Sequence, residues 1–434
     1  MSDRLRVPLL FALVFGLILA AGVVQGANTA LLILNMGLVS AITALGVNLQ
    51  WGYAGLFNIG VMGFVALGGL AAVLVGMPPT AEAWAAGGAR MMMALAAGAL
   101  SIAAAILAWR RLPRGAARVL GAAAILVVGF TIYRGLYGPA AAAIEAVNPA
   151  GTGYLGGLGL PILLAWPVGG LLAAGAAWLI GKTALGLRAD YLAIATLGIA
   201  EIIIAVLKNE DWLSRGVKNV VGVPRPVPYE RDLQADPDFV ERAAGFGLDP
   251  VTASTIWVKV EYAALFAAVL VVVFVLAQLA LRSPWGRMVR AIRDNEVAAE
   301  AMGKDVKARH LQIFVLGSAI CGIAGAMMTT LDGQLTPGAY QPLRFTFLVW
   351  VMVIVGGSGN NWGAVLGGFL IWFLWVEVEP LGLWLIGTLT EALPPGSGLR
   401  ERLLDGAQHA RLLTMGLVLL LVLRFAPRGL VPER

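Results

Sequence analysis

The chain has 434 residues, of which 59% are hydrophobic and 13% are charged, whereas about 25% are charged in an average soluble domain. This composition excludes an ordinary soluble protein. The net charge of +6 does not indicate nucleic-acid binding, because the basic residues lie in short clusters between apolar runs, as orientation signals do. The single cysteine, Cys321, excludes an internal disulfide and a cysteine-based metal motif. We expect no metal and no cofactor.

A helix that crosses the hydrocarbon core of a membrane needs about 20 apolar residues. Segments of this kind lie, in chain order, at 7–25, 28–50, 53–77, 90–110, 117–137, 158–181, 190–207, 259–281, 311–331, 343–357, 362–378 and 410–425. They predict an all-α fold, a polytopic transmembrane helical bundle of about 10–12 spans. The first segment resembles a secretory signal, but we interpret it as a retained span because it is long and further spans follow.

The basic clusters test this map, because cytoplasmic loops of membrane proteins are rich in lysine and arginine. With the spans counted alternately from a cytoplasmic N-terminus, every cluster falls on the cytoplasmic side: Arg4 and Arg6; Arg110, Arg111, Arg114 and Arg118; Lys182 and Arg188; residues 282–310; and Arg424, Arg428 and Arg434. Both termini are therefore predicted to be cytoplasmic. Residues 209–258 fall outside, with eight acidic and five basic residues, and the prolines at 224, 226 and 228 disfavour regular helix there.

Residues 282–310 form a polar connection between two spans. Within it, the apolar residues from 285 to 302 recur largely at helical spacing, opposite Arg290 and Arg293. We predict one helix over this stretch, ended by Gly303. The residues alone leave two interpretations open, namely a basic loop lying on the membrane surface or a helix on which another protein docks.

Four separated motifs carry a resemblance to a known family. They are SPWGRMVRAIRDNE at 283–296 with AAEAMG at 298–303, LRADYLAIATLGIAEI at 187–202, VGGSGNNWG at 355–363 and RFAPRGL at 424–430. Because they stand in the family's order, the chain resembles, over most of its length, the LivM-type inner-membrane permease subunits of branched-chain amino acid ABC importers. It departs from the family near Asn58 and Val61, where a serine and another polar residue are usual, and in a longer apolar insertion between about 80 and 160.

The resemblance implies a permease subunit of an ATP-driven importer for branched-chain or related amino acids, in a bacterial inner membrane. It implies a single transmembrane permease domain over 1–434, not an enzyme, with 209–258 as a periplasmic loop and 282–310 as the cytoplasmic coupling loop. The ATPase-coupling residues would be Arg290, Arg293, Glu296, Ala299, Glu300 and Gly303. The partners would be two ABC ATP-binding subunits, a homologous LivH-type permease subunit, a periplasmic substrate-binding protein and the lipid bilayer.

Three polar residues of the apolar segments are candidates for the translocation pathway, namely Asn58, Thr196 and Glu201. Glu201 is the most costly, since a charged carboxylate at mid-span costs about 2.5–3.5 kcal/mol even on lenient scales. It either lines or gates the pathway, or it bonds to a neighbouring helix and holds the bundle together. The same residue supports an alternative function, a self-sufficient secondary transporter or channel that uses Glu201 as its coupling carboxylate.

Overall fold

The computed structural model describes residues 3–391, 398–407 and 410–433, which are mostly α-helical. Arg434, the last residue of the basic clusters, lies outside this part. Nine of the described helices are long and apolar enough to cross a membrane. They are α1 (Asp3–Gln25), α2 (Ala27–Gln50), α5 (Ala89–Arg111), α6 (Ala116–Glu145), α7 (Ala165–Ala184), α8 (Ala189–Asn209), α12 (Pro250–Arg282), α15 (Val306–Asp332) and α17 (Asn361–Leu389). Three shorter helices, α3 (Val61–Gly76), α16 (Pro342–Gly356) and α19 (Ala410–Phe425), occupy the remaining predicted positions. The predicted all-α membrane bundle is confirmed.

The predicted boundaries are wrong in five places. Helix α6 ends at Glu145 rather than 137, and α12 begins at Pro250 rather than 259, so the predicted 209–258 loop ends at residue 249. Three other boundaries also differ. The segment predicted at 53–77 becomes helical only at Val61, because residues 51–60 form a loop that is hydrogen-bonded to α2, α8 and α16. The segment predicted from 158 begins at Ile162, as a 3-10 turn before α7. The segment predicted to end at 378 continues through Pro380 to Leu389.

Short elements fill the connections. Those between α3 and α8 are α4 (Ala81–Ala83), the π-helix η1 (Trp84–Gly88) and the 3-10 helix η2 (Ile162–Leu164). The region predicted to lie outside holds α9 (Asp211–Ser214), η3 (Gly216–Lys218), β1 (Val220–Val221), α10 (Glu230–Ala235) and α11 (Pro237–Gly245). Strand β1 pairs antiparallel with β2 (Gln334–Leu335), which precedes η4 (Pro337–Ala339). The proline-rich stretch after β1 is not helical, as predicted, and α18 (Gly398–Ala407) lies between α17 and α19.

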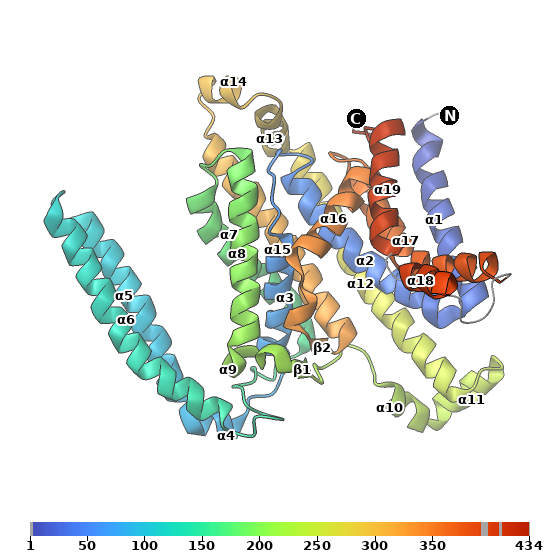
Figure 1. Cartoon of the computed structure of the whole chain (residues 1–434), viewed down its shortest axis with the longest axis horizontal. Helices are drawn as coiled ribbons and strands as arrows, with labels where there is room; N and C mark the ends of the chain where they lie inside the picture. The colour runs from blue at the N-terminus through green and yellow to red at the C-terminus, as the bar shows by residue number, and fades with distance from the viewer. Residues whose placement is uncertain (1–2, 392–397, 408–409, 434) are drawn as a thin grey trace.

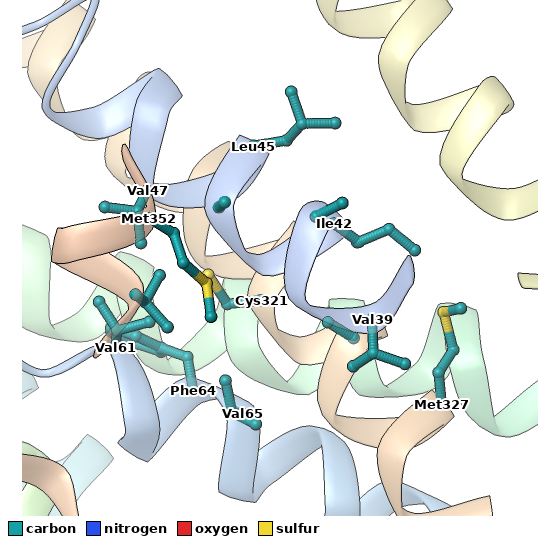
Figure 2. Close-up of a cluster of buried hydrophobic side chains, with 14 of the residues drawn as sticks. Val39, Ile42, Leu45, Val47, Val61, Phe64, Val65, Cys321, Met327 and Met352 are labelled. Carbon is teal, nitrogen blue, oxygen red and sulfur yellow. The ribbon is translucent and has the colours of Figure 1, made fainter. Parts of the chain in front are cut away.

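Helices α2, α3 and α15 form the centre of the bundle, with α7, α16 and α17 packed around them (Figure 1). Figure 2 shows the apolar side chains that fill the space where α2, α3, α15 and α16 meet. Glycines let the backbones approach closely, which suits membrane helices that gain no hydrophobic drive from their lipid surroundings. A methyl group on Gly325 would lie 1.9 Å from the carbonyl oxygen of Val65, and one on Gly367 1.9 Å from that of Met352.

Helices α5 and α6 form a hairpin that leans away from the bundle (Figure 1). The hairpin packs through one end, where Met91, Tyr137, Ile144 and Trp212 belong to a small apolar cluster of their own. At this end the Tyr137 hydroxyl donates to the Glu210 carboxylate, which also accepts the indole N–H of Trp212 at 2.7 Å. The hairpin is therefore anchored at its base, whereas most of its length extends away from the bundle.

The two ends of the bundle differ in what they carry. The start of α1, the end of α19 and the connection between α12 and α15 lie at one end, at the top of Figure 1. Helices α4, α9, α10 and α11 and the two strands lie at the other end. This arrangement agrees with an even number of spans, which the alternation of basic clusters requires.

Candidate coupling element and intramembrane polar residues

The segment after α12 is not one helix but two, α13 (Pro284–Asp294) and α14 (Glu296–Ala301). The predicted single helix over 285–302 is therefore wrong. Asn295 breaks it with an extended backbone, and its side chain accepts the N–H of Ala298 at 3.0 Å. Asparagine is a strong helix N-cap, because its side-chain oxygen satisfies a free N–H of the first turn. Gly303 ends α14 with a φ of 74°, as predicted.

Helices α13 and α14, with the bend at Asn295 between them, form an elbow. One face of the elbow is anchored to the rest of the chain. Val289 and Ile292 of α13 are buried, and Ile292 packs with Ala299 and Val306 in a small apolar cluster. The predicted apolar face is wrong at Val297 and Met302, which are 77% and 79% exposed. The change of direction at Asn295 explains this difference, because it turns α14 out of the helical phase of α13.

Arg293 ties the elbow to two other segments. Its guanidinium donates to the carbonyl of Gly52 in the 51–60 loop, to Glu433 near the C-terminus at 3.0 Å and to the adjacent Asp294 at 3.0 Å. Burial alone would lower the pKa of Arg293, but the hydrogen bonds with Glu433 and Asp294 outweigh it and raise the pKa. Arg290 makes a longer contact, 3.4 Å to the carbonyl of Leu281. The Arg293 guanidinium is therefore bound by groups of its own chain.

The other face of the elbow is exposed. Glu296 and Glu300 of α14 are exposed, together with Val297 and Met302, whereas Ala299 faces the protein. The outward side of α14 thus presents two carboxylates beside two large apolar side chains. Gly303 follows directly, where its N–H donates to the carbonyl of Glu300 at 2.8 Å. Of the six predicted coupling residues, the two acidic ones and Gly303 lie on this exposed tip.

The chain beyond α19 packs against the turn between α16 and α17. The N–H groups of Leu430 and Val431 donate to the end of α16 at 2.8 Å each, and Asn360 donates to the carbonyl of Pro432 at 3.0 Å. Asn48 of α2 accepts the N–H of Gly359 at 2.9 Å in the same turn. The predicted spans leave a short connection here, but the sequence did not predict this C-terminal clasp, although the RFAPRGL motif marks its beginning.

Asn58 and Thr196 come together, and both are buried. The Asn58 amide donates to Gln50 at 2.8 Å and accepts the N–H of Gly60 at 2.9 Å. The Thr196 hydroxyl accepts the N–H of Ile59 at 3.1 Å. These bonds satisfy polar groups that would otherwise be costly at membrane depth. Both residues hold the 51–60 loop in place, and a role for them in the pathway stays a prediction.

Glu201 lies elsewhere. It is exposed on α8, on the side opposite Thr196, and within the described residues it makes no hydrogen bond or ion pair. The interpretation that it bonds to a neighbouring helix of this chain is therefore wrong for the part that the structure describes. Asn58, Thr196 and Glu201 do not form one site.

Two further observations concern possible metal and ligand sites. In the described ranges, no three histidine, cysteine, aspartate or glutamate side chains gather as a metal site requires. A cavity of about 50 Å³ lies between α2, α3, α15, α16 and α17, and Thr43, Met62, Met352 and Trp372 are among its lining residues. It is smaller than the ligand pockets of about 300–1,000 Å³ that small molecules occupy.

A bundle of membrane-spanning helices, with an anchored polar elbow projecting from one end, defines a multi-pass membrane protein. The chain belongs to the family described as the permease component of branched-chain amino acid transport systems, whose sequence model matches residues 115–423. The predicted resemblance to this permease family is thereby confirmed.

Three relatives show the extent of the similarity. The chain is 29% identical to the high-affinity branched-chain amino acid transport system permease protein LivM of Escherichia coli (strain K12), over 72% of this chain and 65% of that protein. It is 28% identical to LivM of Salmonella typhimurium over the same shares, and 27% identical to the probable LivM of Methanocaldococcus jannaschii over 57% of this chain and 61% of that protein. The matches thus span less than two thirds of the length of these relatives. No solved structure matches the chain.

Proposed function

We propose that the chain is a transmembrane subunit of an ATP-driven importer for branched-chain or related amino acids. Its family membership and the transport function for which its relatives are named support this proposal. In this proposal the chain provides part of the pathway and catalyses no reaction. It works in a bacterial inner membrane with a second, LivH-type permease subunit, two ATP-binding subunits and a periplasmic substrate-binding protein.

The observation that carries the proposal is the two-faced elbow formed by α13 and α14. Its inner face is anchored by Ile292 and Arg293, whereas its outer face exposes Glu296, Val297 and Glu300. A separate ATPase that binds such an element can pass its motion on to the bundle only if the element is stiff and well attached. Arg293 supplies attachment at two points, Gly52 and Glu433, which belong to different parts of the bundle.

The same proposal assigns the sides of the membrane. The elbow, the start of α1 and the end of α19 lie at one end of the bundle, which we place in the cytoplasm on the strength of the basic clusters. The segment 209–258 then faces the periplasm, where its short helices α10 and α11 offer a surface for a binding protein. The alternative, a secondary transporter that relies on Glu201, would leave the elbow without a partner.

Reconstitution of the transporter tests this proposal. The complete assembly is purified from its own membranes, inserted into liposomes with ATP inside, and supplied outside with leucine and the binding protein. We expect uptake that requires ATP and that persists when proton and sodium gradients are collapsed. Uptake by the purified single chain, driven by an ion gradient without ATP, would overturn the proposal and favour the alternative.

A further inference from the structure

The outward face of α8 carries, in the middle of a membrane helix, a carboxyl group that makes no hydrogen bond or ion pair with the part of the chain that the structure describes. Glu201 is exposed, and α8 extends from Ala189 to Asn209, so about eight residues separate Glu201 from the nearer end. At a rise of about 1.5 Å per residue, that end lies roughly 12 Å away, which is beyond the reach of a glutamate side chain. Glu201 therefore cannot reach the membrane surface in the way that long basic side chains do.

Lipid is a poor neighbour for this face. Ionisable residues within membrane spans almost always face a bundle interior or a water-filled cavity, because hydrocarbon offers them no hydrogen bonds. The opposite side of α8 is occupied by its own chain, where Thr196, Ala200 and Ile204 are buried. What satisfies Glu201 must come from outside the described part of this chain.

The residues around Glu201 suit close packing with another helix. Gly198 lies on the same face, one turn away, and a methyl group placed on it would meet nothing within 4 Å. Ala205, one turn beyond Glu201, is exposed as well. Small residues beside a polar one are typical of helix–helix interfaces in membranes. An uncovered glycine does not by itself indicate an interface, since a methyl group on Gly416 of α19 would also meet nothing within 4 Å. Helix α19, however, carries no exposed mid-span carboxylate among its described residues.

Two other occupants fit less well. Arg134 of α6 is exposed within its span, yet no ion pair joins it to Glu201 in the described chain. A second copy of this chain, docked symmetrically through the same face, would bring residues near the axis against their own copies. Two glutamates would then face each other at membrane depth, and neither could supply the other with a cation.

We propose that the outward face of α8, centred on Gly198 and Glu201, is the surface on which a second, non-identical permease subunit docks within the membrane. That subunit brings a cation or a hydrogen-bond donor to the depth of Glu201. The inference rests on the proposed function, because it takes the occupant to be the other permease subunit of the same importer.

Photocrosslinking tests this surface in membranes that contain the assembled transporter. Benzoyl-phenylalanine is placed at Ala205 or, as a matched control, at Val272 of α12, which is 57% exposed. We expect the label at Ala205 to join the chain to a second membrane subunit of different mass, and the label at Val272 to join it to lipid. Lipid adducts alone at Ala205, a product of two identical chains, or a crosslink to α6 would each overturn the proposal.

A substitution gives an independent readout. Gly198→Leu fills space that the chain itself leaves empty, so the isolated chain should fold and unfold as before, and Gly416→Leu is the matched control. We expect Gly198→Leu to lower recovery of the second subunit about tenfold, which corresponds to ~1.4 kcal/mol, and Gly416→Leu to leave it unchanged. Equal losses for both variants would contradict the inference.

A charge swap separates the remaining case. If Glu201→Arg abolishes assembly and Arg134→Glu in the same chain restores it, the partner of Glu201 is α6, and the proposal is wrong. We expect no restoration. ATP-driven uptake by the unaltered transporter separates failure of the proposed function from failure of the docking surface. Uptake that persists while the crosslink fails would overturn only the docking surface.

Discussion

The central bundle and the α5–α6 hairpin are both made of apolar helices, but they are completed in different ways. In the bundle, Gly325 and Gly367 press against the backbone of neighbouring helices, so no room remains for a methyl group. In the hairpin, Gly135 meets nothing within 4 Å, and contacts with the rest of the chain gather around Tyr137 and Trp212. The interior of the bundle is thus filled by its own residues, whereas the hairpin leaves its faces to lipid or to another subunit.

Gly325→Ala attacks the closed region and should have the largest effect. The added methyl would lie 1.9 Å from the carbonyl oxygen of Val65, and overpacking of a filled core costs about 1–3 kcal/mol or more. We expect a clear fall in the midpoint of thermal unfolding in detergent. An unchanged midpoint would show that α3 and α15 are not in contact at this level.

Arg293→Ala removes the link between the elbow and the bundle. Hydrogen bonds to charged groups contribute about 1.5–3 kcal/mol, and Glu433, which is partly exposed, would lose its partner. We expect substrate-stimulated ATP hydrolysis to fall while the complex still assembles. Arg118→Ala on α6 is the control, because the Arg118 side chain donates to the carbonyl of Trp109 within the α5–α6 hairpin in the described chain.

Tyr137→Phe weakens the base of the hairpin. It deletes the hydroxyl that donates to Glu210 but leaves the ring packed against Trp212. We therefore expect the free energy of unfolding to fall by about 1.5 kcal/mol. Spin labels at Val119 of α6 and Leu179 of α7 should report a broader distance distribution. A distribution as narrow as in the unaltered protein would mean that Glu210 does not hold the hairpin.

Gly135→Ala should have the smallest effect and the opposite sign to Gly325→Ala. Alanine is favoured over glycine in a helix interior by about 0.8–1.0 kcal/mol, and the position has space for the methyl. A slight rise in the unfolding midpoint is expected. A fall would show that Gly135 lies in a contact made by another subunit or in a bend of α6.

Hydropathy predicted where the helices lie, because apolar length sets a membrane span regardless of its neighbours. It could not predict the loop at 51–60, since the polar groups of Asn58 and its neighbours are satisfied by α8 and α16, which are distant in sequence. Likewise the elbow was expected as one helix, because the apolar spacing continues past position 295, although asparagine is favoured at N-caps over helix interiors. The geometry at Asn295 decides between the two.

For the candidate pathway residues, the sequence showed that the side chains are polar but not whether they face the protein or its surroundings. Thr196 and Glu201 are five residues apart on one helix, and only the packing of α8 shows that the first is buried and the second exposed. The link from Arg293 to Glu433 was equally hidden, because 140 residues separate the two in the chain. Long-range contacts of this kind leave no local pattern to read.

The effect of Glu300→Arg on coupling tests the central claim most directly. Glu300 lies on the exposed side of α14 and makes no ion pair in the described chain, so reversing its charge should leave the fold intact. In the reconstituted complex we expect leucine-stimulated ATP hydrolysis to fall about tenfold, through a mismatch of charge at the docking surface. Glu82→Arg on α4, which is exposed at the other end of the bundle and which no proposed docking surface includes, should leave hydrolysis unchanged. Full stimulation in the Glu300→Arg complex would contradict the account.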